Sequence, residues 1–375
     1  MNRKELREIR RRVRPDRNNI QRIYGCYINS QREIIAEIEE SFGLLGTEEQ
    51  EKYTALLKKA LSGTLGKNLM DLNFSTQQVV DGDEHRLLSA LRRTRVDDPV
   101  VRRQFFRCVA DNLDMGDSNY VVLIACDAYD VPHFGKDGQR DEEDREVFDY
   151  LLCSVCPVKT AKPVLRFSSE ENRFENLSLS QIVGTPELGF MFPAFDDRSA
   201  NIYSALFYSR DTKGIHSDFI DAVFKTEVPL SAGQQRSAFS AAMTEVLDSD
   251  CSLEMVQAVH GQLRERIEQH RESNDPEPLT MTYAEVEEML ENGGMDESLR
   301  GSFLKSCDSQ FGKDHLLSPE NLMDSKKFEI KTESVTVKVD PDFSSLVKTQ
   351  VIDGRKYILI PADGAVEVNG ISVNL

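Results

Sequence analysis

Aspartates at the ends of predicted strands are the residues of this sequence whose type and placement best suit acid–base or metal chemistry. Asp127 and Asp130 end an apolar run over residues 120–129, and the adjacent pair Asp196 and Asp197 falls between two other predicted strands. Carboxylates that converge can bind a divalent cation or act as general acid and general base. Adjacent carboxylates at a strand end are, however, more often part of a turn or a salt bridge. We therefore carry a metal-dependent hydrolase or nuclease that uses Asp127, Asp196 and Asp197 as an alternative hypothesis only.

Basic residues at the start of the chain suggest different chemistry. The first 22 residues carry nine Lys and Arg against three acidic residues, whereas the formal charge of all 375 residues is −18. A cluster of cations at one end of an acidic protein is suited to contact a polyanion through that end, because the rest of the chain repels it. The candidate phosphate-binding residues are Arg3, Lys4, Arg7, Arg10, Arg11, Arg12, Arg14 and Arg17.

The same basic segment has a second interpretation. Its arginines could pair with the acidic remainder of the same chain, or they could pair with a partner subunit. Pairing with a partner subunit predicts a homodimer without a catalytic role. Tyr24 and Tyr27, close by in the sequence, could stack on exposed bases if a nucleic acid binds. The sequence therefore leaves two uses for the arginines, and the expected partners are RNA, DNA, a ribonucleoprotein or a second copy of the chain.

Two further motifs favour structural roles. Cys153 and Cys156 have the spacing of a redox or zinc pair, but they lie in an apolar strand-like run, where an odd spacing points the two thiols to opposite faces. No second cysteine pair exists to complete a four-ligand zinc site. The segment GTLGKN over 63–68 resembles a phosphate-binding loop only in its Gly-Lys, and it fits a helix end better. We predict neither a metal site nor a cofactor here.

The elements that must position these residues begin with a basic helix. Over residues 2–13, Leu6, Ile9 and Val13 form one apolar stripe, Asn2 and Glu5 are spaced like a capping pair, and Pro15 ends the helix. A strand pair across Asn29-Ser30 and two helices follow.

The remaining pattern divides the chain into four segments that differ in predicted secondary structure. Residues 1–119 hold the basic helix, the strand pair and helices, and residues 120–231 read as a β-rich core joined by hairpins, with a polar loop over 135–146. Residues 232–325 repeat apolar positions at helical spacing, and residues 326–375 read as short strands that form a small sheet. The sequence predicts an α+β fold with a central, mostly antiparallel sheet, flanking helices, a helical segment and a small C-terminal β element.

Composition narrows the class of protein. With 39% hydrophobic and 29% charged residues, the chain has the make-up of a folded protein. We expect a cytoplasmic location, because the basic start is not followed by the apolar region of a signal peptide and no apolar run could cross a membrane. Enzyme signatures such as the nucleophile elbow, the dinucleotide-binding glycines and the zinc-protease motif are absent from the sequence, which favours a binding protein over an enzyme.

Several long blocks of the sequence resemble one bacterial family, the domain of unknown function 4317, found largely in Firmicutes. The blocks extend over most of the chain and cover residues 14–29, 55–69, 127–138, 150–163, 187–211, 328–339 and 351–370. The resemblance implies a bacterial source and a cytoplasmic setting, and it implies no functional residue.

The order of parts also resembles, at the level of arrangement, the nucleoid-associated protein family. That resemblance implies an association with nucleic acid. Together with the basic first 22 residues, it leads us to expect a protein that binds nucleic acid or a nucleoprotein through its N-terminal segment.

Overall fold

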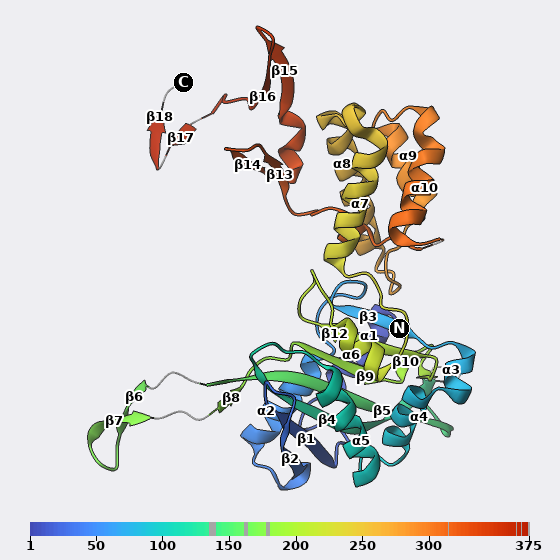
Figure 1. Ribbon diagram of the computed structural model, residues 1–375, viewed down its shortest axis with the longest axis vertical. Coiled ribbons are helices and arrows are strands. Elements are labelled where there is room, and N and C mark those ends of the chain that lie inside the picture. The colour runs from blue at the N-terminus through green and yellow to red at the C-terminus, as the bar shows by residue number, and fades with distance from the viewer. Residues whose placement is uncertain are drawn as a thin grey trace. The chain divides into compact units, whose positions relative to one another are not determined.

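The fold is that of a computed structural model, which describes residues 1–134, 140–160, 164–177, 181–313, 315–364, 366–368 and 370–373. The chain divides into two compact units (Figure 1). The first unit comprises residues 1–231 together with Pro276–Pro278, and the second comprises residues 232–275 and 279–375.

An eight-stranded antiparallel sheet forms the centre of the first unit. Its strands follow the order β2-β1-β4-β5-β9-β12-β3, and β8 pairs with β5 beside this path. Strands from both ends of the unit's sequence therefore share one sheet. The bounds are β1 Arg22–Ile28, β2 Ile34–Ser41, β3 Leu69–Asn73, β4 Asn119–Phe134, β5 Arg140–Thr160, β8 Gln181–Val183, β9 Leu188–Phe192 and β12 Ser204–Ser209.

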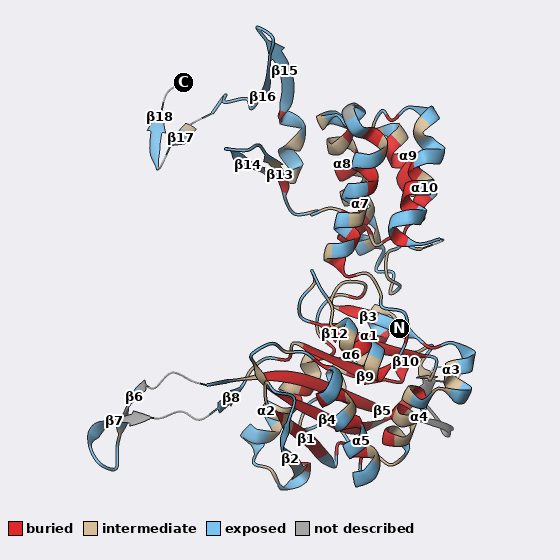
Figure 2. Cartoon of the chain, in the orientation of Figure 1, coloured by how far each residue is buried: buried red, intermediate tan, exposed pale blue. Residues whose placement is uncertain are grey.

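Helices cover both faces of this sheet and make it the middle of three layers. One face packs against α4 (Asp83–Arg93), α5 (Pro99–Asn112) and α6 (Ser217–Val223) in a cluster rich in phenylalanine. The other face packs against α1 (Arg3–Arg12) and α2 (Thr47–Lys59). Figure 2 shows the strands buried between these helices. The predicted α+β fold with a mostly antiparallel sheet is confirmed.

Short elements complete the first unit. They lie in the connections between the strands and helices of the three layers. They are η1 Phe42–Leu44, α3 Thr76–Asp81, the hairpin of β6 Val164–Ser168 and β7 Arg173–Leu177, and the hairpin of β10 Ala194–Asp196 and β11 Ser199–Asn201.

The cysteine pair behaves as its spacing predicts. Cys153 and Cys156 are both buried in β5, and they face the two different hydrophobic clusters on opposite sides of the sheet. Burial raises the pKa of the Cys156 thiol to about 12, so the thiol stays protonated at neutral pH. Both residues are therefore core thiols.

Two loop predictions need adjustment. The polar run over 135–146 is strand from Arg140 onward, because β5 starts there and pairs with the end of β4; residues 135–139 lie outside the described residues. The segment over 63–68 is a turn between α2 and β3, with Gly63 and Gly66 at positive φ, and not the end of the helix itself, which is capped at Ala60.

Helices dominate the first part of the second unit, as the sequence predicts. Thr282 and Glu285 form the expected capping box of α9, and Gly293 caps its C-terminus. The helices are α7 Ala232–Leu247, η2 Asp248–Asp250, α8 Leu253–Ser273, α9 Tyr283–Asn292, η3 Glu297–Leu299, α10 Arg300–Phe311 and α11 Pro319–Leu322.

The C-terminal strands form three separate two-stranded hairpins, where a single small sheet was predicted. The sequence alternation is right for strands, but it does not specify which strands pair. The hairpins are β13 Phe328–Lys331 with β14 Thr336–Val339, β15 Lys348–Ile352 with β16 Arg355–Leu359, and β17 Val366–Val368 with β18 Ile371–Val373. The segment η4 (Pro341–Leu346) joins the first hairpin to the second.

Candidate functional site

Helix α1 is fixed to the sheet by its apolar stripe. Leu6, Ile9 and Val13 are buried in the cluster that also contains α2 and one face of the sheet. At the start of the helix, the Asn2 side chain accepts from the backbone N–H groups of Lys4 and Glu5, and Glu5 accepts from the N–H of Asn2. The capped and packed helix therefore holds its basic residues on a fixed surface.

A pocket of about 460 Å³ lies between α1 and the distal part of β4. Five cationic side chains and one acidic side chain line it, together with the ring of Tyr129. The lining residues are Lys4, Arg7, Glu8, Arg11, Arg12, Arg17 and Tyr129. We call this the first cationic pocket, and its charge suits an anionic ligand.

The acidic residue of the first cationic pocket is already bound on two sides. Glu8 accepts a hydrogen bond from the Tyr129 hydroxyl through one carboxylate oxygen, and Arg198 donates to the other at 2.9 Å. Arg198 also donates to the carbonyl of Pro132 and, through its backbone N–H, to Glu5. Glu8 therefore anchors α1 to the sheet, and among the described residues its two carboxylate oxygens bind Tyr129 and Arg198 and none of the pocket's five cations.

Arg12 forms the inner wall of the pocket. Its guanidinium lies 4.4 Å from the centre of the Tyr129 ring and donates to the carbonyl of Arg17 at 2.9 Å. Burial, followed by the bond to Glu8, raises the pKa of Tyr129 to about 12, so its hydroxyl remains a donor at neutral pH. This arrangement fixes the segment that follows α1 and brings Arg17 into the pocket.

A second group of cations, Arg10, Arg14 and Lys58, lies beside the pocket. The pKa of Arg10 is lowered by burial and by the charge of Arg7, and that of Lys58 is lowered by burial and by the charges of Arg14 and Arg10. Lys58 comes from the last turn of α2, so this second cluster joins two helices. We define the basic surface as Lys4, Arg7, Arg10, Arg11, Arg12, Arg14, Arg17 and Lys58.

Few acidic groups neutralise the basic surface. In the part of the chain that the structure describes, the side chains of Lys4, Arg7, Arg11 and Arg14 form no ion pair; Arg17 lies 3.6 Å from Asp16, and Arg10 donates to the carbonyl of Gly63. The backbone N–H of Arg3 donates to the carbonyl of Pro276. Within the described residues, the side chains of Lys4, Arg7, Arg11 and Arg14 therefore remain available to an anionic ligand.

Asp127 is buried in β4 and has a structural role. It accepts hydrogen bonds from the Tyr150 hydroxyl at 2.6 Å, from the backbone N–H of Asn19 at 2.7 Å and from that of Ala128 at 2.9 Å. Burial raises the pKa of Asp127 although these bonds oppose the shift. Through Asn19, the carboxylate fixes the segment between α1 and β1 to the middle of β4. The expectation that Asp127 ends a strand is wrong, because β4 continues to Phe134 in its pairing with β5.

The other aspartates occupy different environments. Asp130 is exposed, Asp196 accepts from the Asn201 side chain, and Asp197 and Arg198 form the two-residue turn of the β10–β11 hairpin with positive φ angles. Among the described residues, no group of three or more His, Cys, Asp or Glu side chains could hold a metal ion. Asp127, Asp196 and Asp197 therefore do not form such a site there.

The two tyrosines near the basic segment differ in exposure: Tyr24 is buried and Tyr27 is partly exposed. Tyr24 is buried, its hydroxyl donates to Asp97 at 2.6 Å, and the Arg102 guanidinium covers its ring at 4.0 Å. The Tyr27 hydroxyl accepts from Asn119. The expectation that Tyr24 stacks on a base is wrong, because the sheet packs helices on both faces and Tyr24 lies in the cluster under α4, α5 and α6.

Sequence reasoning missed several residues of the first cationic pocket and of the surface around it. Glu8 and Tyr129 line the first cationic pocket, Arg198 supports it, and Lys58 extends the surface, although none was singled out. The only available signal was the position of Tyr129 and Arg198 next to the candidate aspartates.

Comparison with known proteins places the chain in one family. The family described as a domain of unknown function (DUF4317) matches residues 1–371, so the chain belongs to it. No curated protein shows significant similarity to the chain. In the described residues, every helix is too short or too polar to cross a membrane.

Proposed function

We propose that this member of the domain of unknown function 4317 family binds nucleic acid, as RNA, DNA or a ribonucleoprotein, through the basic surface. The observation that carries the proposal is the first cationic pocket, in which five cations face one space and Glu8, the acid among its lining residues, is already bound to Tyr129 and Arg198. Regularly spaced phosphates are the polyanion that such a surface fits.

The chemistry of the surface favours contact with phosphates over contact with bases. Arginine and lysine bind phosphate oxygens through charge-assisted hydrogen bonds. The Tyr129 ring is covered by Arg12 and Tyr24 is buried, so neither offers a free face for stacking. We therefore expect binding with little dependence on base sequence and with a strong dependence on salt.

The charge of the whole chain sets the orientation of binding. Outside the first 22 residues the chain carries 37 basic and 61 acidic residues, a net charge of −24. This charge repels a polyanion from most of the molecule and confines productive encounters to the basic surface. The resemblance in arrangement to nucleoid-associated proteins and the expected cytoplasmic location agree with this proposal.

The test uses point variants, since residues 1–17 include the buried Leu6, Ile9 and Val13 and their deletion would expose the core. The variant Arg7→Gln/Arg11→Gln removes two exposed charges of the pocket. Its control, Arg93→Gln/Arg107→Gln, removes two exposed arginines from α4 and α5, which cover the other face of the sheet.

Fluorescence anisotropy with duplex DNA and with single-stranded RNA, measured over a series of salt concentrations, gives the result. On duplex DNA we expect the slope of log K against log salt to fall by about 0.9 for each phosphate that the variant no longer neutralises, and the control to keep the slope of the intact protein. Identical slopes for both variants and the intact protein would contradict the proposal.

Light scattering on the same variants addresses the alternative that these arginines hold a second copy of the chain. The intact protein could have the mass of two chains and Arg7→Gln/Arg11→Gln the mass of one, with no change in nucleic-acid affinity. That result would assign the arginines to a homodimer and overturn the proposal.

A further inference from the structure

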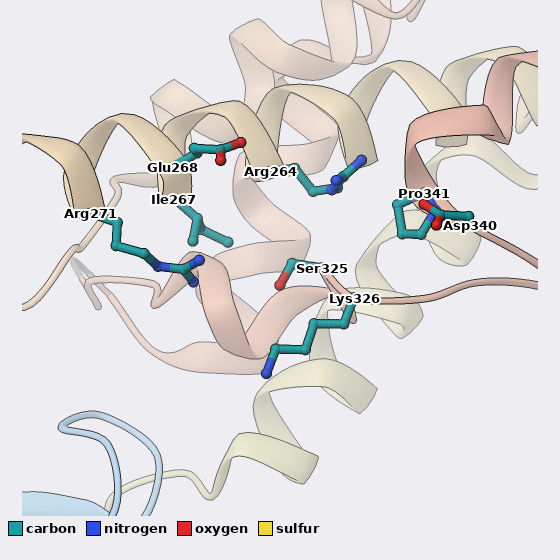
Figure 3. A pocket seen from close by; sticks show the side chains of 8 residues that line it. All are labelled: Arg264, Ile267, Glu268, Arg271, Ser325, Lys326, Asp340 and Pro341. Atoms are coloured by element: carbon teal, nitrogen blue, oxygen red, sulfur yellow. The ribbon is translucent and has the colours of Figure 1, made fainter.

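A second pocket, of about 350 Å³, lies within the second unit and has no part in the proposed function. Helix α8 forms one side, the turn before β13 forms another, and the start of η4 closes the end (Figure 3). The lining residues are Arg264, Ile267, Glu268, Arg271, Ser325, Lys326, Asp340 and Pro341. We call it the second cationic pocket.

The wall from α8 follows from helical spacing. Arg264 and Arg271 are seven residues apart and therefore lie on the same face two turns from each other. Ile267, between them, is buried and gives the pocket an apolar floor. The helix thus places two guanidinium groups along one side.

The opposite wall is a fixed turn. The backbone N–H of Lys326 donates to the Asp324 side chain at 3.1 Å, and the carbonyl of Asp324 is 2.9 Å from the Nε2 of His260 on α8. His260 is itself buried. Ser325 and Lys326 are therefore held opposite α8 by contacts that do not involve their own side chains.

The cations of this pocket differ in what binds them. Arg264 donates to Asp342 at 2.6 Å, which ties η4 to α8. In the described residues, the side chains of Arg271 and Lys326 have no acidic partner within ion-pair distance. Figure 3 shows Glu268 directed along α8 toward Arg264 and away from the Arg271 guanidinium.

The free groups line one space. In Figure 3 the Arg271 guanidinium and the Ser325 hydroxyl face the opening between α8 and the turn, and the Lys326 side chain extends from the turn away from α8, on the side of the pocket where Arg271 lies. A planar guanidinium, a mobile ammonium group and a hydroxyl donor together match the oxygens of a phosphate monoester, which carries up to two negative charges.

We propose that Arg271, Ser325 and Lys326 bind the phosphate group of a small phosphate monoester. The pocket volume falls in the range of about 300–1,000 Å³ that small-molecule sites occupy, and it exceeds what the phosphate alone needs. Ile267 offers an apolar surface for the organic part of the ligand. Asp340 and Glu268 lower the net charge, so the pocket suits one phosphate group better than a phosphate polymer.

Calorimetric titration of the full chain with glycerol 3-phosphate and with inorganic phosphate tests the proposal. Sodium chloride at matched ionic strength and glycerol are the controls for charge and for the organic part. Saturable binding of glycerol 3-phosphate supports a monoester site, and tighter binding of inorganic phosphate would overturn the assignment to a monoester.

Two variants locate the binding. Arg271→Gln/Lys326→Gln removes the two unpaired cations and should weaken binding at least about tenfold, because each charge-assisted hydrogen bond is a strong one. Lys305→Gln/Lys327→Gln removes two exposed lysines of the same unit that do not line the pocket, and it should bind as the intact protein does.

The basic surface must also be excluded as the source of binding. The Arg7→Gln/Arg11→Gln protein should bind glycerol 3-phosphate as the intact protein does, whether or not it binds nucleic acid. Equal affinity of the intact protein and Arg271→Gln/Lys326→Gln for glycerol 3-phosphate, or absence of heat from glycerol 3-phosphate at tens of millimolar, would overturn the proposal.

Discussion

The two cationic pockets use the same residue types and differ in how many charges are left unpaired. In the first, five cations share the space with Glu8, whose carboxylate is bound on both oxygens. In the second, Arg264 is paired with Asp342, and Glu268 and Asp340 contribute negative charge to the lining. The pairing of cations with nearby acidic side chains, more than the number of arginines, decides whether a surface suits a polymer or a single phosphate group.

The pockets also differ in what holds them. The first rests on buried contacts, which include the stripe of α1, Asp127 and the bonds of Glu8. The second rests on a partly exposed helix face and on a turn fixed by His260. Substitutions at the buried anchors of the first pocket should therefore lower stability more than a substitution at the exposed cap of α9.

The largest expected effect comes from removing the apolar anchor of the first pocket. Ile9 is fully buried, so Ile9→Ala should lower the free energy of unfolding of the first unit by about 2–5 kcal/mol. Urea denaturation measures it. Leu44→Ala, at a residue 88% exposed, is the control and should change stability by less than about 0.5 kcal/mol. Phosphate binding by the second pocket should persist in both variants.

Asp127 gives the next largest effect and a defined pH dependence. Asp127→Asn should lower the free energy of unfolding by about 1–3 kcal/mol, because the amide nitrogen cannot accept the hydrogen bond that the buried Tyr150 hydroxyl donates to Asp127. Burial raises the pKa of Asp127 in the folded state, so the wild type is most stable relative to Asp127→Asn below the pKa of an unfolded aspartate.

That advantage should shrink as the pH rises through the folded pKa, since asparagine does not titrate. Urea denaturation over a pH series measures the difference between the two proteins. A cost that grows from acidic to neutral pH would contradict the assigned direction.

Arg198 tests whether a bound Glu8 keeps the first pocket cationic. Arg198→Gln should lower the free energy of unfolding by only about 1 kcal/mol, because its ion pair with Glu8 is partly exposed and screened by solvent. It also leaves one Glu8 oxygen free to attract the cations of the pocket, so nucleic-acid affinity should fall. Arg210→Gln removes the pair with Glu187 elsewhere in the first unit and should leave affinity unchanged.

The smallest effect is expected in the second unit, at the cap of α9. Glu285 accepts from the N–H of Thr282 at 2.8 Å, and that bond holds the pKa of Glu285 below its usual value. Glu285→Gln should therefore lower the free energy of unfolding of the second unit by about 0.5–1 kcal/mol near neutral pH. The stabilisation is present above the pKa of an unfolded glutamate and is lost as the pH falls through the lower folded pKa, so the two proteins should converge in acid.

Local sequence patterns predicted many elements correctly. The spacing of Leu6, Ile9 and Val13 identified the buried face of α1, the odd spacing of Cys153 and Cys156 placed them on opposite faces of β5, and Thr282 with Glu285 marked the start of α9. These features depend on periods of two or 3.6 residues and on side chains that bond to nearby backbone groups. Such information lies within a few residues of chain.

Pairing over long distances could not be read in the same way. The place of β3 beside β12 and the division of the C-terminal strands into three hairpins depend on which edges meet, and alternation along a strand does not encode that choice. The same applies to the contact of Arg198 with Glu8, which are 190 residues apart.

Charge counts and helical spacing already show that the cations gather at one end of an acidic chain and that the helix carrying them has an apolar stripe to bury. Only the tertiary structure decided that Glu8 is bound by Tyr129 and Arg198, that Lys58 joins the basic surface, and that Asp127 is a buried acceptor in the fold. The physical reason is that net charge and periodicity are properties of the chain, whereas the pairing and burial of a charge depend on neighbours that only folding brings together.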